Sequence, residues 1–168
     1  MHREVGQSRA REMCARCVGA LHGAADMNTD RFKEVQIIDS WSRNAAPWTD
    51  SVRQQEIESR RLVTDPAIID VIKRQAPRSV LDIGCGEGWL ARALAAEGIV
   101  VTGLDAVPEL ILRAKQAGGG TFHVASFEDI AAGGTGLTAQ LAVCNYSLLG
   151  KESVSSLIPA SVGRSLRA

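Results

Sequence analysis

The spacing of apolar side chains changes near residue 77, from a helical pattern to a strand-like one. Before that point, apolar positions recur three or four residues apart, which predicts amphipathic helices. Good cap residues and Pro47 divide the region into three predicted helices, which begin near Arg31, Thr49 and Thr64. Residues 1–26 carry few large apolar side chains. We therefore expect a loose N-terminal arm, and Met27 is a candidate for the natural start.

After residue 77, short apolar runs alternate with helical segments. The predicted strands are 79–83, 99–104, 121–125 and 141–144, and the predicted helices are 89–97, 108–116, 127–132 and 153–160. Such alternation with short connections predicts a parallel sheet that is covered by helices on both faces. The expected fold is α/β and Rossmann-like, a doubly wound parallel sheet. Ligands of such sheets bind beyond the carboxyl ends of the strands.

A glycine-rich loop follows the first predicted strand, with Asp82, Gly84, Gly86 and Gly88 at alternate positions. Glycine lets a ligand approach the backbone closely. A dinucleotide-binding fingerprint, counted from Gly84, would need its third glycine at position 89, where this chain has Trp89. A carboxylate at position 82 would repel a pyrophosphate and attract an ammonium group. The loop therefore favours a cofactor with a cationic end.

Asp105 ends the second predicted strand, 21 residues after Gly84. A carboxylate there can accept hydrogen bonds from both hydroxyls of a ribose. This feature suits NAD as well as S-adenosylmethionine, so Asp105 indicates a nucleoside without choosing between the two.

Residues 80–90 resemble motif I of the class I S-adenosylmethionine-dependent methyltransferases, in the type that acts on small molecules. The resemblance covers roughly residues 60–150. It implies S-adenosyl-L-methionine as the cofactor, and it implies that residues 27–76 form a helical cap over a cofactor-binding half-domain at 77–168. The cofactor-binding residues that it implies are Asp82, Gly84, Cys85, Gly86, Asp105, Ala106, Ser126, Phe127, Asn145 and Arg61.

The resemblance also implies a role for each part of the site. Asp82 would hold the ammonium group, residues 84–86 would line the methionine part, and Asp105 would bind the ribose. Ser126 and Phe127 would flank the adenine, although many relatives have an aspartate at the position of Ser126. Packing in the core is the alternative for Phe127.

Further assignments concern the sulfonium, the cofactor carboxylate and the catalytic base. Asn145 and Tyr146 occupy positions that the family places near the sulfonium. Arg61 or Arg60 would pair with the cofactor carboxylate, and a solvated arginine is the alternative for each. No residue is assigned as a catalytic base. His123 and Tyr146 are candidates by type alone, and the apolar neighbours of His123 favour a structural role.

The family has seven strands, in the order 3-2-1-4-5-7-6, and only four are recognised here. We expect a chain that is incomplete at its C-terminus, whose fourth strand is an exposed edge open to self-association. The leading function is methyl transfer to a small-molecule acceptor. The alternative is a truncated, non-catalytic cofactor-binding or interaction module, and an NAD-dependent oxidoreductase is a distant third.

The composition indicates which kinds of binding partner to expect. Nineteen basic residues balance nineteen acidic ones, so the chain has no basic footprint for nucleic acid. No apolar run approaches the roughly 18 residues of a membrane span, and we expect a cytoplasmic protein. Cys14, Cys17 and His22 are too few to form a four-ligand zinc site, so no metal is expected.

Overall fold

The structure is a computed structural model that describes residues 34–133 and 135–149. The predicted arm at 1–26, the candidate start at Met27, the helix predicted at 153–160 and the Cys14, Cys17 and His22 group lie outside these residues. The described helices are α2 (Glu34–Arg53), the π-helix η1 (Arg60–Thr64), α3 (Asp65–Arg74), α4 (Trp89–Ala95), α5 (Pro108–Ala117) and α6 (Phe127–Ala131). The described strands are β1 (Ser79–Ile83), β2 (Val100–Asp105), β3 (Thr121–Val124) and β4 (Leu141–Val143).

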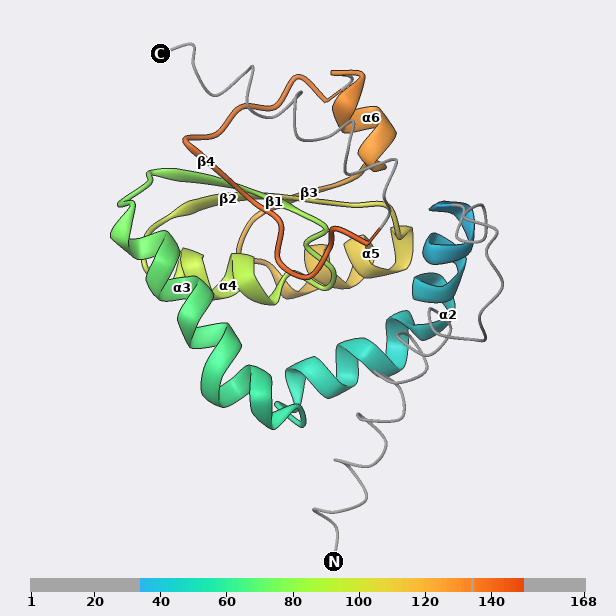
Figure 1. The fold of residues 1–168 in the computed structure, drawn as a ribbon, viewed down its shortest axis with the longest axis horizontal. Helices are drawn as coiled ribbons and strands as arrows, with labels where there is room; N and C mark the ends of the chain where they lie inside the picture. The colour runs from blue at the N-terminus through green and yellow to red at the C-terminus, as the bar shows by residue number, and fades with distance from the viewer. Residues whose placement is uncertain (1–33, 134, 150–168) are drawn as a thin grey trace, which may run out of the picture.

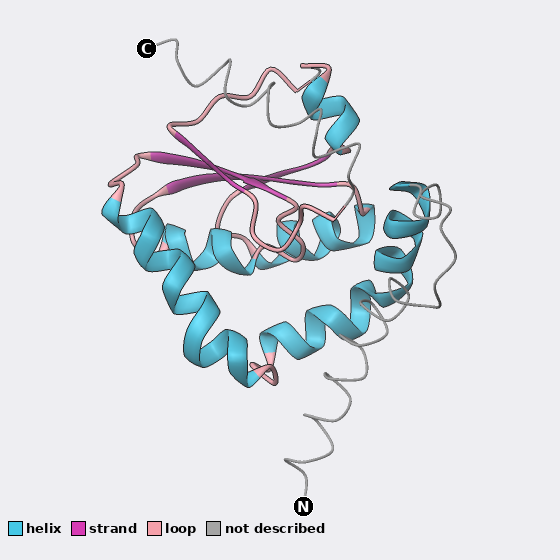
Figure 2. Cartoon of the chain, viewed as in Figure 1, coloured by secondary structure: helices cyan, strands magenta, loops and turns pink. Residues whose placement is uncertain are grey.

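The four strands form one parallel sheet in the order β3-β2-β1-β4. Helices α3, α4 and α5 lie on one face of the sheet and α6 lies on the other (Figures 1 and 2). This arrangement confirms the predicted α/β, doubly wound, Rossmann-like fold. The chain first winds outward from β1 to β3 and then returns to the other side of β1 at β4. The reversal makes the ends of β1 and β4 the expected ligand crevice.

Apolar residues of the two central strands are buried toward both layers of helices. On the face of α4 and α5, the core contains Val80 and Val101 together with Leu90 and Leu94 of α4. On the face of α6, a smaller cluster contains Ile83, Leu104, Ala125 and Ile130. Central strands of a parallel sheet are covered on both sides, which explains their continuous apolar runs. The two clusters hold the carboxyl ends of β1 and β2 in place.

The helix predicted to start at Thr49 is not separate. Helix α2 runs from Glu34 to Arg53 with Pro47 inside it, and its direction changes along its length (Figure 1). Thr49 does not act as a cap, because its hydroxyl donates to the carbonyl oxygen of Ala45 at 2.7 Å within the helix. The chain turns only after Arg53, where Gln55 has a φ of +54°.

The predicted helix after Thr64 is confirmed, since α3 begins at Asp65 with a proline in its first turn, but the predicted side-chain cap at Thr64 is wrong. Thr64 has helical dihedral angles, φ −79° and ψ −37°, and makes no side-chain cap. The wide turn of η1 therefore continues directly into α3. Among the described residues, the Thr64 hydroxyl oxygen is the buried side-chain atom that has no hydrogen-bond partner.

Candidate functional site

The glycine loop after β1 folds over the ends of the neighbouring strands. The backbone N–H groups of Gly84 and Cys85 both donate to the Leu104 carbonyl, at 2.7 and 2.9 Å. From the segment after β4, the Ser147 hydroxyl donates to the Ile83 carbonyl at 2.6 Å. Gly84 has a φ of +78°, and a Cβ there would lie 2.1 Å from the Cβ of Ser147. Position 84 therefore requires glycine because two protein segments meet there.

Gly86 connects this loop to Asp105. The Gly86 N–H donates to one carboxylate oxygen of Asp105, and the Val107 N–H donates to the other, each at 2.9 Å. A Cβ at Gly86 would have no atom within 4 Å, so the space over the loop is open there. Burial raises the pKa of Asp105, and the two backbone donors oppose that shift. Both oxygens keep lone pairs for a further donor.

Asp82 lies on the strand next to Asp105 and is only 2% exposed. Burial, reinforced by the charge of Asp105, raises the pKa of Asp82 from its ordinary 3.8 to about 7. None of the hydrogen bonds among the described residues reaches its carboxylate. The described residues therefore leave the acceptors of this buried carboxylate free for a ligand.

The side chain of Cys85 packs into the core, so only the backbone of this residue is available to a ligand above the glycine loop. A Cβ at Gly103 of β2 would lie 2.8 Å from the Cys85 sulfur and 2.7 Å from the Phe122 ring, so these groups fill the gap over Gly103. The residue is 4% exposed, and burial raises the pKa of the Cys85 thiol. Ala106 is half-buried directly after Asp105.

Ser126 and Phe127 begin helix α6 rather than standing free after β3. The Ser126 hydroxyl accepts from the Asp129 N–H at 3.1 Å, and the Asp129 carboxylate accepts from the Ser126 N–H at 2.9 Å. This is a capping box. Phe127 packs against the cluster that contains Ile83 and Leu104. Both residues therefore have structural contacts at the positions where the adenine is expected.

The two arginines of η1 have different surroundings. The Arg60 guanidinium bonds to Asp65 at 3.1 Å and lies over the rings of Trp48 and Trp89, 5.4 and 4.9 Å from their centroids. Arg61 is exposed and lines a cavity of about 600 Å³ beside α2, η1 and α4. No described contact joins Arg61 to the glycine loop, so the structure does not bring this residue together with Asp82.

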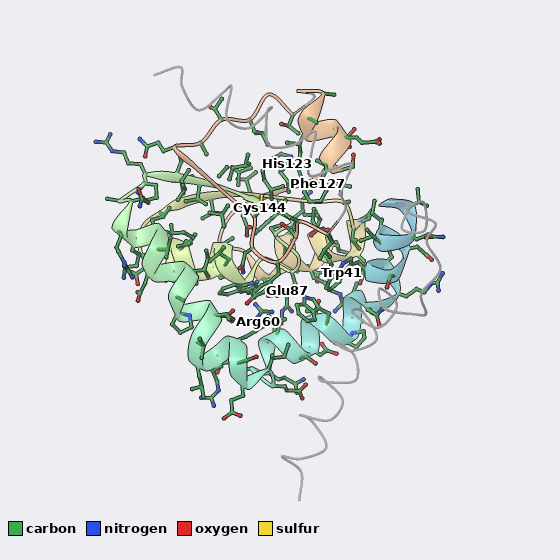
Figure 3. The ribbon with its side chains drawn as sticks, viewed as in Figure 1. Trp41, Arg60, Glu87, His123, Phe127 and Cys144 are labelled. Carbon is green, nitrogen blue, oxygen red and sulfur yellow. The ribbon has the colours of Figure 1, made fainter. Side chains whose placement is uncertain are left out.

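The remaining candidates lie at the strand ends. Asn145 is half-buried and Tyr146 is 65% exposed, directly after β4. Tyr146 has a φ of +59°, a left-handed conformation that is uncommon for tyrosine. His123 is exposed on β3, at the edge of the described sheet (Figure 3). The sequence-based expectation of a packed structural histidine is therefore wrong.

Sequence reasoning missed Glu87, which lies inside the glycine loop and is 1% exposed. Its carboxylate is held by Arg53 of α2 and Arg92 of α4. The signal that could have found it is a charged residue between two glycines in a loop that must be closely packed.

Metal-binding clusters and membrane-spanning helices are both absent from the described part of the chain. Within 34–133 and 135–149, no group of three or more His, Cys, Asp or Glu side chains is arranged to hold a metal ion. In the same ranges, no helix is long and apolar enough to cross a membrane.

A family model and a curated relative each match part of this chain. A family model described as "methyltransferase domain" matches residues 56–158. A ubiquinone biosynthesis O-methyltransferase from Xylella fastidiosa is 46% identical over 57 residues, which are 32% of this chain and 23% of that protein. The match thus spans about a quarter of that relative's length.

Solved structures share the fold. A TehB-like SAM-dependent methyltransferase from Corynebacterium glutamicum has a TM-score of 0.58 and 23% identity, over 74% of this chain and 67% of its own. Magnesium protoporphyrin IX methyltransferase from Synechocystis, with bound SAH, has a TM-score of 0.52 and 20% identity, over 97% and 66%.

Proposed function

Because this chain belongs to the methyltransferase domain family, we propose that the ends of β1 and β2 bind S-adenosylmethionine and that the protein methylates a small-molecule acceptor. The observation that carries this proposal is the pairing of Asp105 with the glycine loop. The carboxylate is fixed by the N–H groups of Gly86 and Val107 at 2.9 Å each, and a Cβ at Gly86 would have no atom within 4 Å. A fixed acceptor pair at a strand end suits the two hydroxyls of a ribose.

The surroundings of Asp82 support the same cofactor. A carboxylate with a pKa near 7 and without a described donor gains from a cationic partner. The ammonium group of S-adenosylmethionine is such a partner, whereas a pyrophosphate would be repelled. The pair of carboxylates therefore argues for this cofactor over NAD.

Binding and orientation are the contributions of the described residues. When bound, the cofactor supplies a methyl group that is activated by a positively charged sulfur. Asp82 and Asp105 would hold its two ends, with Gly84, the backbone of Cys85 and Gly86 beneath it. Holding two reactants in a productive orientation is a large part of catalysis in such reactions.

The acceptor side would be built around the segment after β4, where Asn145 and Tyr146 lie. The curated relative is named for methylation of an oxygen in ubiquinone biosynthesis. We therefore propose the hydroxyl of a small molecule as the acceptor class. The side chain of Arg61 and those of Ser126 and Phe127 remain proposed cofactor contacts.

Calorimetry with S-adenosylmethionine, its demethylated product S-adenosylhomocysteine and NAD tests the proposal. We expect binding of the first two ligands and none of NAD. Replacing Asp105 by Ala removes the acceptors for the ribose and should weaken binding at least about tenfold, since hydrogen bonds to charged groups contribute about 1.5–3 kcal/mol. Asp70→Ala on α3 is the control, because Asp70 is exposed and lies on a helix rather than at the end of a strand.

Three results would contradict the proposal. These are binding of NAD alone, equal affinity in Asp105→Ala and the unchanged chain, and no affinity for either sulfur compound in a folded sample. Transfer of labelled methyl from S-adenosylmethionine to phenolic acceptors then separates an active enzyme from a cofactor-binding module.

A cytoplasmic location and self-association are further parts of the proposal. Self-association would use β4, the outermost strand on its side of the described sheet. Light scattering at several protein concentrations measures the mass in solution, and a constant monomer mass would overturn self-association.

A further inference from the structure

Glu87 is a buried carboxylate placed among glycines. It lies between Gly86 and Gly88, whose φ values are +56° and +80°, and its side chain has no exposed surface. Figure 3 shows Glu87 on the side of the sheet where α2 and Arg60 lie. Burial of an unpaired carboxylate is strongly unfavourable, so the partners of Glu87 determine whether the loop can keep this conformation.

Those partners come from two separate helices. Arg92 of α4 donates to both carboxylate oxygens of Glu87, at 2.6 and 2.8 Å, and to its backbone carbonyl at 2.8 Å. Arg53, in the last turn of α2, donates from Nε to the carboxylate at 2.8 Å. Arg92 is local, five residues away, whereas Arg53 is 34 residues away.

Arg53 also joins α2 to helix α5. Its Nη2 donates to the carbonyl oxygen of Arg113 in α5, at 3.1 Å. Nearer the N-terminal end of α2 than Arg53, Ala45 packs with Val107 and Leu110. The end of α2 is thereby held against both the glycine loop and α5.

We infer that Glu87 is a positioning residue, through which the end of α2 sets the conformation of the glycine loop. Gly86, whose N–H fixes Asp105, is the adjacent residue in the chain. A shift of Glu87 therefore displaces the donor that orients Asp105. This inference rests on the proposed function, because it makes affinity for S-adenosylmethionine depend on Arg53 of the N-terminal helix.

The test compares two arginine variants of α2 in the full chain. Arg53→Met keeps an unbranched side chain but has no donor, so it removes the α2 contact and leaves Glu87 paired with Arg92. Arg43→Met is the matched control, because Arg43 is exposed and pairs only with Asp39 on the same helix among the described residues. The dissociation constant for S-adenosylhomocysteine is measured by calorimetry, and amide hydrogen exchange is measured with and without it.

We expect Arg53→Met to raise the dissociation constant about tenfold, within the usual range for coupling between two parts of a protein. Arg43→Met should leave it unchanged. In the unliganded Arg53→Met variant, amides of the glycine loop should exchange faster while those of β3 keep their rates. The ligand should slow exchange in the last turn of α2 in the unchanged chain, by reciprocity, but not in Arg53→Met.

Equal affinity and equal loop exchange in Arg53→Met and the unchanged chain would overturn the inference. If Arg53→Met unfolds, Arg53→Ala takes its place, because alanine also lacks a side-chain donor and has the highest helix propensity. An affinity equal to that of the unchanged chain would again overturn the inference. Absence of binding in the unchanged chain would instead contradict the proposed function, and loop exchange in the unliganded variants would still test the role of Glu87.

Discussion

At the scale of single residues, Asp82 combines deep burial with a charge that the described protein atoms do not neutralise. The folded chain holds a proton on this carboxylate more tightly than the unfolded chain, because its pKa rises from 3.8 to about 7. Between these values the folded state carries more protons, so stability falls as pH rises. Above pH 7 the full cost of the buried charge is present.

We predict that Asp82→Asn stabilises the cofactor-free protein at pH 8 and has little effect at pH 4. Asparagine keeps the shape and removes the charge. The gain should grow between pH 4 and 7 toward an upper value of about 4 kcal/mol, because each tenfold change in proton affinity corresponds to about 1.4 kcal/mol. Urea unfolding at several pH values measures it. A gain that does not depend on pH would contradict the assignment.

Gly84 and Gly98 share a left-handed backbone and differ in their surroundings. Their φ values are +78° and +79°, but a Cβ at Gly84 would overlap Ser147 at 2.1 Å, whereas one at Gly98 would have no neighbour within 4 Å. The two positions therefore separate backbone strain from steric overlap.

We predict that Gly98→Ala costs about 1 kcal/mol of stability, the strain of a left-handed alanine. Gly84→Ala should cost at least about 2 kcal/mol more, because the segment after β4 must also move away. Thermal unfolding of both variants gives the comparison. Equal losses would show that Ser147 does not constrain the loop.

The spacing of the residues in the loop predicted Asp82, Gly84, Gly86 and Asp105 correctly as neighbours at the strand ends. It could not predict that Gly84 meets Ser147, since that contact joins segments far apart in the sequence. Nor could it predict that Ser126 caps α6, or that the Cys85 side chain points into the core. Such contacts depend on how the layers pack, and they leave no periodic trace in the sequence.

At the scale of elements, the wide turn of η1 leaves one hydroxyl unsatisfied. Thr64 Oγ1 is buried without a partner, while the Thr49 hydroxyl in α2 is buried and bonded to Ala45 at 2.7 Å. An unpaired buried hydroxyl costs free energy, and a paired one contributes to stability.

We therefore predict opposite effects for the same replacement. Thr64→Val should stabilise the protein and Thr49→Val should destabilise it, each by about 1 kcal/mol. Denaturant unfolding measured on both variants checks the signs. Loss of stability in Thr64→Val would indicate that its hydroxyl has a partner in solution.

The N-terminal helices were harder to predict than the strands. Thr49 and Thr64 are good cap residues, and each is followed by an acidic residue, so local rules placed helix starts there. Both hydroxyls instead lie within continuous helix. Tertiary packing of α2 on α5 and the π-turn outweighed local preference, as weak propensities allow.

At the scale of the whole molecule, the sheet was predictable because the alternation of short apolar runs with helices is visible in the sequence. This alternation allows few sheet topologies, and the preference for right-handed crossovers selects among them. The link from α2 to the glycine loop was not predictable, because Arg53 and Glu87 are two ordinary charged residues in the sequence. Only the three-dimensional structure shows that the end of α2 contacts the loop after β1.

The aromatic cluster around Arg60 has a practical consequence. The chain has three tryptophans, Trp41, Trp48 and Trp89. Trp41 and Trp48 meet edge to face at 5.4 Å, and Arg60 lies over Trp48 and Trp89. All ultraviolet emission from indole rings thus originates where the N-terminal helices meet the start of α4. A movement of that junction would change the wavelength or the intensity of tryptophan fluorescence. The unlabelled protein therefore reports on this junction through its own fluorescence.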